Sequence, residues 1–307
     1  MRVEQLEYVT AVVRHGSFRR AAEEMNISQP ALSETVQKLE RELGVRILDR
    51  RRSGTTITDD GRELLPHMLN AIDAVDRLRH AAGSHGEGTQ VVRLGTVTAA
   101  TAPLVTPTIQ RFREMHATTR VEVVAAQQER LHRDLLEGAL DLGLVNYLGG
   151  EEPPGSLETV ELLRGRPVAC IRGDSPLAER PTVTSEELAA QPLIAMRSGY
   201  VMHRYLVRLL GGRPPNFSYS TDGAEMGKLM VAEGLGAAVL PDYSVIGDPL
   251  EQRGAITYRP IADDDTEVML LLHHRRSEST PRTVRDLRAL FVEQAQRRTA
   301  AIAAAPA

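Results

Sequence analysis

The chain has 307 residues, of which 42% are hydrophobic and 25% are charged, and its formal net charge is -4. This composition is typical of a soluble globular protein with two or three domains. Cys170 is the only cysteine, which excludes an intramolecular disulfide and a multi-cysteine metal site. No stretch reaches the roughly 18 apolar residues of a membrane span, and the N-terminus does not look like a leader, so we expect a cytoplasmic protein.

Basic residues outnumber acidic residues only in the first part of the chain, residues 1–58. They contain ten Lys and Arg residues against eight Asp and Glu residues, whereas the remainder contains 27 against 33. A protein of negative net charge can still bind a polyanion when its positive charge is concentrated in one segment. The distribution therefore favours a nucleic-acid contact within this first segment.

Two short helices are predicted before residue 28. The segment from Val3 to Arg14 places apolar residues on one helical face, and residues 15–16 end it. Ser17 is expected to cap a second helix that runs to Met25, and residues 26–28 then break the chain. These two helices can pack together with a third helix to form a small hydrophobic core.

The third helix carries the features of a DNA-reading helix. Ser28 is expected to cap it, Pro30 lies in its first turn, and Gly44 ends it. Its inward stripe consists of Leu32, Val36, Leu39 and Leu43. Its polar face carries Gln29, Ser33 and Gln37, repeating every four residues from the helix start, where a recognition helix presents side chains to the major groove.

A short hairpin is predicted between Arg46 and Thr58. Arg50, Arg51 and Arg52 form a basic run in front of the turn residues Ser53 and Gly54. Such a run beside a reading helix can contact DNA phosphates. The alternative is an ordinary solvated charge run.

The combination of GSF, AA, SQPALS, LE, LG and a following LDR at this spacing resembles the winged helix-turn-helix of LysR-type transcriptional regulators. The resemblance extends over essentially the whole chain. It implies an α/β protein with an N-terminal winged helix-turn-helix, a long linker helix and a C-terminal two-lobed effector domain of the periplasmic-binding-protein type. Glu34 departs from the pattern, because many relatives have a basic residue there; it would repel phosphate but could accept a hydrogen bond from cytosine.

A long linker helix is predicted over residues 59–82, after a DNA-binding domain at residues 1–58. Its apolar stripe consists of Leu65, Met68, Ile72, Val75, Leu78 and Ala82. A stripe this long and narrow favours a two-helix seam, so we expect a homodimer, and the resemblance implies a tetramer. The alternative is packing against the helix's own effector domain. Residues 83–90 are the expected hinge.

Strands and helices alternate from residue 91 to residue 298, which indicates parallel sheets flanked by helices. The resemblance implies two lobes crossed twice by the chain, roughly residues 91–162 plus 268–298 and residues 163–267. A flexible tail is expected at residues 299–307.

Loops that leave a strand and enter a helix are the candidate effector-binding positions, because exposed amides at helix N-termini favour anions. By resemblance, the effector cleft is lined by Thr98, Thr101, Asn146, Arg197, Ser198, Gly199, Tyr200 and Thr221. Arg197 could clamp a carboxylate, so the effector could be anionic. The alternatives are a salt-bridged or exposed Arg197, and a capping role for the two threonines.

The remaining motifs do not indicate catalysis or a cofactor. In EGLGAAVLP a helix precedes the glycines and a strand follows, which is the reverse of a dinucleotide-binding loop. No histidine spacing suits a metal, and no nucleophile motif is present, so we predict neither metal, cofactor nor enzyme activity. Cys170 lies in an apolar run and is read as a buried strand residue, with a lone thiol sensor as the alternative.

The sequence therefore predicts a sequence-specific DNA-binding transcriptional regulator modulated by a small molecule between two lobes. Ser28, Gln29, Pro30, Ser33 and Gln37 are expected at base edges or nearby sugar, and Lys38 with the three arginines at phosphates. The alternative is a small-molecule binding protein whose N-terminal helices form a protein-interaction module. That module would need an exposed apolar face, whereas the outward face of the third helix is polar.

Overall fold

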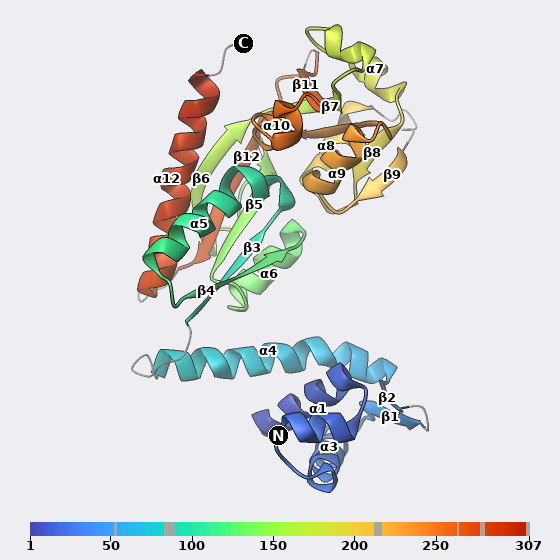
Figure 1. Ribbon diagram of the computed structural model, residues 1–307, viewed down its shortest axis with the longest axis vertical. Helices are drawn as coiled ribbons and strands as arrows, with labels where there is room; N and C mark the ends of the chain where they lie inside the picture. Colours follow the sequence, from blue (N-terminus) through green and yellow to red (C-terminus); the bar gives the residue numbers. More distant parts are fainter. Residues whose placement is uncertain (52–53, 83–89, 212–216, 263, 277–279, 305–307) are drawn as a thin grey trace. The chain divides into compact units, whose positions relative to one another are not determined.

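The computed structural model describes residues 1–51, 54–82, 90–211, 217–262, 264–276 and 280–304 (Figure 1). The chain divides into two compact units, Met1–Gly88 and Thr89–Ala307, and each has its own hydrophobic core. Of the predicted hinge at residues 83–90, only Gln90 is among the described residues.

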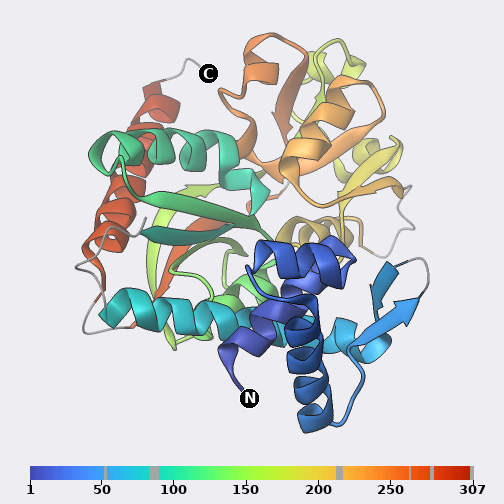
Figure 2. The same ribbon diagram turned by 60° about the horizontal axis from the view of Figure 1, so that its bottom comes forward.

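The N-terminal unit consists of three short helices, a hairpin and a long helix. These elements are α1 (Val3–His15), α2 (Phe18–Glu24), α3 (Gln29–Leu43), β1 (Leu48–Arg51), β2 (Gly54–Ile57) and α4 (Asp59–Ala82). Figure 2 shows the hairpin standing beside the helices of the same unit. The two predicted caps are confirmed, since Ser17 Oγ accepts from Arg20 N and Ser28 Oγ from Ala31 N.

Two contacts hold the hairpin against the helices. Glu40 of α3 accepts through Oε1 from Ile47 N at 2.8 Å and from Leu48 N at 3.0 Å, just where β1 begins. On the other strand, Thr55 N donates to Gly16 O at 2.9 Å, at the end of α1. The hairpin is therefore bonded to α3 through β1 and to the end of α1 through β2.

One side of α4 packs inside the N-terminal unit. Met68 is 5% exposed and belongs to the core of α1, α2 and α3, and Ile72 packs against that core. Leu69 and Leu78 are 47% and 68% exposed. The predicted seam is therefore wrong at Met68, because α1 supplies the apolar surface that covers this part of the stripe.

The second unit is built on two five-stranded sheets, one in each lobe. The first sheet has the order β4-β3-β5-β12-β6, formed by Arg120–Ala125, Val91–Thr96, Leu142–Leu148, Val268–Arg275 and Leu157–Gly165. The second has the order β11-β7-β10-β8-β9, formed by Ile256–Pro260, Pro167–Arg172, Ala237–Pro241, Leu193–Met196 and Phe217–Thr221.

Helices cover both sheets. The first lobe carries the short turns η1 (Thr98–Ala100) and η2 (Thr101–Val105), then α5 (Thr106–Met115), α6 (Gln128–Leu136) and α12 (Arg282–Ala304). The second carries η3 (Pro176–Glu179), α7 (Ser185–Ala189), α8 (Val201–Leu209), α9 (Ala224–Ala232), α10 (Asp242–Val245) and α11 (Pro249–Gln252). Within the first lobe, α5 lies beside α12 (Figure 1).

The sheets are mixed and not wholly parallel. Strands β3, β4 and β5 run parallel, but β12 is antiparallel to β5 and β6, and β7 is antiparallel to β10 and β11. The prediction of parallel sheets is wrong at these strands because β7 and β12 each follow a strand of the other sheet, without a crossover helix in the described residues between the two strands.

Strand β6 is absent from the sequence prediction. Leu162 and Leu163 are both buried, and the pairing with β12 shifts register between Leu270 and Leu271, so the period of two is interrupted. The predicted lobe change at residues 162–163 falls inside this strand, and the first crossing follows Gly165 instead. The chain returns to the first sheet with β12, which begins at Val268.

The predicted flexible tail at residues 299–307 is also wrong in part, because α12 continues to Ala304. Arg298, just before it, donates through NH2 to the carbonyls of Tyr243 and Ile246 at the end of α10. Thr299 Oγ1 donates to Ala295 O at 3.1 Å within the helix. These bonds hold the last turns of α12, and residues 305–307 lie outside the described part of the chain.

Candidate functional site

Helix α3 has one wholly buried face and one polar face. Leu32, Val36 and Leu39 are each 0% exposed, whereas Leu43, the last member of the predicted stripe, is 38% exposed. Leu43 is exposed because the helix ends at Gly44, which adopts φ 74°. The predicted polar residues lie opposite: Ser28, Gln29, Pro30, Gln37 and Lys38 are exposed, and Ser33 is partly exposed.

Glu34 and Lys38 form an ion pair on this polar face. Lys38 Nζ lies 2.9 Å from Glu34 Oε1, with both side chains largely exposed. The hydrogen bond from Lys38 lowers the pKa of Glu34, so the carboxylate is charged at neutral pH. The positive charge of Lys38 offsets the repulsion that Glu34 would otherwise exert on a phosphate. The same ion pair engages Lys38, which was predicted to contact a phosphate.

The arginine run lies in the hairpin, as expected for a wing. Arg50 pairs with Thr55 and Arg51 with Gly54 in the antiparallel register of β1 and β2. Arg52 lies outside the described residues.

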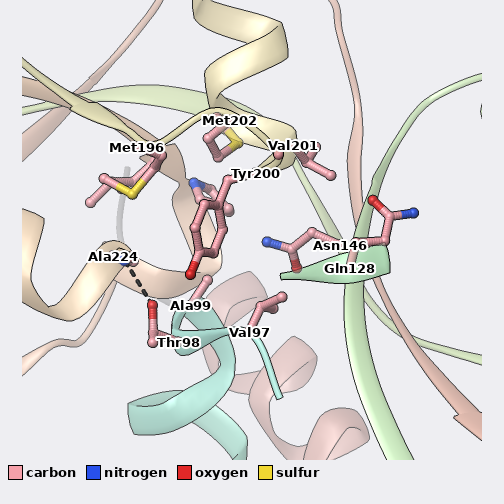
Figure 3. Close-up of a pocket in the computed structure, with 14 residues that line it drawn as sticks. Val97, Thr98, Ala99, Gln128, Asn146, Met196, Tyr200, Val201, Met202 and Ala224 are labelled. Carbon is pink, nitrogen blue, oxygen red and sulfur yellow. Dashed lines mark hydrogen bonds between the residues drawn. The ribbon is translucent and has the colours of Figure 1, made fainter. Parts of the chain in front are cut away.

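A cavity lies between the two lobes of the second unit (Figure 3). Four of the predicted effector positions line it: Thr98, Asn146, Gly199 and Tyr200. The other lining residues are Val97, Ala99, Gln128, Met196, Val201, Met202, Gly223, Ala224, Leu240 and Pro241. The lining residues come from both sheets, so the cavity depends on how the chain crosses between the lobes.

Hydrogen bonds join the lobes around this cavity. Thr98 Oγ1 accepts from Ala224 N at 2.8 Å, which ties the start of η1 to the start of α9 (Figure 3). Gly223 has φ 146°, and a Cβ built there would lie 1.9 Å from Thr98 Oγ1, so only glycine permits this approach. Gln127 Nε2 donates to Ser198 O at 2.9 Å between the same lobes.

A buried hydrogen bond involves Asn146, one of the lining residues. Tyr243 OH donates to Asn146 Oδ1 at 2.9 Å, joining α10 to the end of β5. Tyr243 is 1% exposed, and burial raises its pKa well above the usual range, so it stays a donor. Asn146 therefore serves the lobe contact through its oxygen.

The cavity has a volume of about 30 Å³. That is room for a water-sized molecule, so an organic ligand must displace Tyr200 or part the lobes. Figure 3 shows the Tyr200 ring projecting among Met196, Ala99 and Thr98. Burial raises the pKa of Tyr200, with Asp222 adding to the effect.

Four predicted effector residues do not line this cavity: Thr101, Arg197, Ser198 and Thr221. Arg197 NH1 lies 3.1 Å from Asp222 Oδ2, and both side chains are 60% exposed. The predicted carboxylate clamp is therefore engaged in a surface ion pair. Ser198 contributes its carbonyl to Gln127, and Thr221 O accepts from Arg197 N at 3.0 Å.

The sequence prediction missed Gln128, Met196, Met202, Gly223 and Leu240. Gln128 and Met202 sit one or two residues inside helices that follow predicted strand ends, so a wider window would have included them. Gly223 and Leu240 carried no comparable signal, because their place in the cavity depends on Thr98 and on the second sheet.

Cys170 is buried in the second lobe. Cys170 is 0% exposed in β7, and burial raises the pKa of its thiol to about 12. No cluster of three or more His, Cys, Asp or Glu residues suitable for a metal occurs among the described residues. None of their helices is long and apolar enough to cross a membrane.

Two family models match the chain. The model described as "Bacterial regulatory helix-turn-helix protein, lysR family" matches residues 3–62, and "LysR substrate binding domain" matches residues 85–296. The chain belongs to the LysR family. It is a DNA-binding transcriptional regulator with a C-terminal effector-binding domain, as the sequence predicted.

Individual relatives agree with this assignment to the LysR family. The HTH-type transcriptional regulator YnfL of Escherichia coli is 30% identical over 288 residues, covering 89% of this chain and 93% of its own. The DNA-binding transcriptional dual regulator OxyR of Escherichia coli is 27% identical over 263 residues, 85% of each chain. Full-length CbnR complexed with its target DNA has the same fold, with a TM-score of 0.67 at 20% identity over 97% of this chain and 100% of CbnR.

Proposed function

We propose that the outward face of α3 reads base edges in the major groove while the wing contacts phosphates. The observation that carries this is the division of α3 into a fully buried stripe and an exposed polar face. The residues assigned to bases or nearby sugar are Ser28, Gln29, Pro30, Ser33 and Gln37, and those assigned to phosphates are Lys38, Arg50, Arg51 and Arg52. The DNA complex of CbnR, a protein of the same fold, supports the proposal.

The interlobe cavity is the proposed effector site. Thr98, Asn146, Gly199 and Tyr200 line it, and hydrogen bonds from both lobes meet there. A ligand that inserts between Thr98 and Ala224 separates the lobes, so its binding energy is coupled to their relative position. Four other predicted effector residues are not among those that line the cavity: Thr101, Arg197, Ser198 and Thr221.

A second copy of the chain is the proposed partner of α4. Leu69 and Leu78 are 47% and 68% exposed on this helix, and neither belongs to the core that buries Met68. Apolar side chains at these positions favour a two-helix contact and therefore a homodimer. Dimerisation presents two copies of α3 to a partly symmetric DNA site, and the family resemblance favours a dimer of such dimers.

Regulation is proposed to depend on ligand binding without turnover and without thiol oxidation. Relatives include hydrogen peroxide-inducible genes activators. Cys170, the only cysteine of this chain, is buried, and its raised pKa keeps it as the thiol, which is the unreactive form. We propose that the protein acts in the cytoplasm, where its DNA lies.

Selection of bound sequences from random duplex DNA tests the assignment of α3. Gln29→Ala should relax the base preference, since it removes a side chain from the outward face. Arg51→Ala should instead weaken binding to all sequences alike and lower the slope of log affinity against log salt by about 0.9. Equal loss on selected and random DNA from Gln29→Ala would contradict the division of roles.

A further inference from the structure

The walls of the interlobe cavity carry no ionisable charge. None of the described residues that line it is Lys, Arg, His, Asp or Glu. Arg197, the nearest predicted cation, is directed to Asp222 at the surface. At the N-terminus of α9, Ala224 N donates to Thr98 Oγ1, so this amide is not free to bind an anion. A carboxylate in this cavity would lose its hydration without gaining a cation.

Gln128 adds a second constraint on the ligand. Its Oε1 is buried and has no hydrogen-bond partner among the described residues. A buried carbonyl in that state favours a ligand that brings a hydrogen-bond donor. A carboxylate, which only accepts hydrogen bonds, would place oxygen against oxygen.

Tyr147 and His132 of the first lobe bear on the orientation of the Gln128 amide. Burial raises the pKa of the Tyr147 hydroxyl, and the Gln128 side chain opposes this rise, which is the effect of an amide N–H and not of an amide oxygen. Tyr147 OH lies 2.8 Å from His132 Nε2. Burial lowers the pKa of His132, so the ring is neutral, and its Nε2 can accept from the Tyr147 hydroxyl in the tautomer protonated at Nδ1. Turning the amide over would therefore direct its oxygen, in place of its N–H, toward the Tyr147 hydroxyl.

We infer that the effector is an uncharged small molecule with an apolar body and a hydrogen-bond donor directed to Gln128 Oε1. This inference rests on the proposed role of the cavity as the effector site. The apolar body faces Met196, Val201, Met202 and Leu240. Methionine side chains are flexible, so these walls can adapt when the ligand displaces Tyr200.

Three probes of one size separate the ligand classes: benzamide is neutral with a donor, acetophenone is neutral with only an acceptor, and benzoate is an anion. Full-length protein is titrated with each by calorimetry at up to about 10 mM. Benzamide should bind roughly tenfold more tightly than benzoate, and more tightly than acetophenone. Benzoate binding as tightly as benzamide, or no binding by any probe, overturns the inference.

Gln128→Met removes the carbonyl at similar volume, and Gln110→Met, an exposed glutamine on α5, is the matched control. Gln128→Met should weaken benzamide about tenfold and leave acetophenone unchanged or tighter, while Gln110→Met changes neither. Unfolding temperatures without probe establish that both variants fold. An unchanged benzamide affinity in Gln128→Met overturns the donor assignment.

Ala99→Leu, which fills the cavity from η1, separates this inference from the proposed function. If a probe binds the wild type and the variant alike, the cavity is not the ligand site, and the proposed function fails. If benzoate binds tightly to the wild type but not to Ala99→Leu, the cavity is the ligand site, and only the chemical class is wrong.

Discussion

The two functional surfaces of this chain are built in different ways. The DNA-facing candidates from Ser28 to Lys38 lie on one helix and its cap, whereas the cavity draws residues from Val97 to Pro241 across two sheets. The first surface needs only that α3 forms and docks. The second exists only when two lobes are packed and crossed correctly, so its geometry depends on interactions distant from it in sequence.

The charged groups that support these surfaces differ accordingly. On α3 the ion pair of Glu34 and Lys38 is exposed, and solvent screens it. In the second lobe, Lys228 is 1% exposed on α9, and its Nζ donates to Asp248 Oδ2, to Ser244 O and to Glu225 Oε1. Breaking a buried pair leaves an uncompensated charge, so we expect large effects in the effector domain and small ones on α3.

Asp248→Asn should have the largest effect. The amide can still accept from Leu250 N, which the carboxylate caps at 2.9 Å, but it no longer neutralises Lys228. We expect the effector domain to lose about 3 to 5 kcal/mol of unfolding free energy. Calorimetric unfolding of the full chain, with hydrogen exchange to assign each transition, measures this loss.

Glu225→Gln is the matched control for that variant. Glu225 also contacts Lys228 Nζ at 3.0 Å, but its side chain is 37% exposed, so we expect a loss below about 1 kcal/mol. If both variants lose the same unfolding free energy, burial of the ion pair does not determine the size of the loss. The proposed difference between the buried pair of the effector domain and the exposed pair on α3 would then be wrong. Exchange in α1 to α3 should remain unchanged in both.

The same contrast explains what could be predicted from the sequence. The bounds of α3 follow from Ser28, Pro30 and Gly44, which act on their immediate neighbours. The positions Thr98 and Tyr200 could also be predicted, because loops after strands are recognisable. The role of Gly223 could not be predicted, because it depends on the close approach of Thr98, which lies 125 residues earlier in the chain.

Arg197 shows the converse limit. Its type and position suit an anion clamp, but the partner that engages it, Asp222, follows a different strand. Sequence gives the charge of a side chain and not its direction. The same limit applies to Leu43, whose spacing fits the buried stripe although the helix ends before a neighbour can cover it.

His273 should give the second largest effect, as a pH dependence confined to the effector domain. The ring is 0% exposed and hydrogen-bonded to Thr159 through Nδ1, and burial lowers its pKa to about 4, with His132 and His274 adding to the shift. Between about pH 4 and 6.5 the unfolded chain binds more protons than the folded chain, so stability falls as pH falls through this range. The loss approaches about 3 kcal/mol.

Urea unfolding at a series of pH values measures this slope. His273→Asn should flatten it, whereas His67→Gln, an exposed position on α4, should leave it unchanged. A slope that survives in His273→Asn would mean that other groups carry the proton uptake.

Glu34→Gln should have the smallest effect, and it addresses the reading helix directly. The substitution removes a negative charge from the outward face and frees Lys38 from the ion pair at 2.9 Å. Lys38 can then neutralise a phosphate, so affinity should rise for all DNA sequences and the salt slope should steepen by up to about 0.9. If Glu34 instead accepts from a cytosine, the variant will gain affinity on random DNA but lose preference at one base position. Binding to selected and random duplexes across a salt series distinguishes these outcomes, and a loss on both would contradict an outward, DNA-facing Glu34.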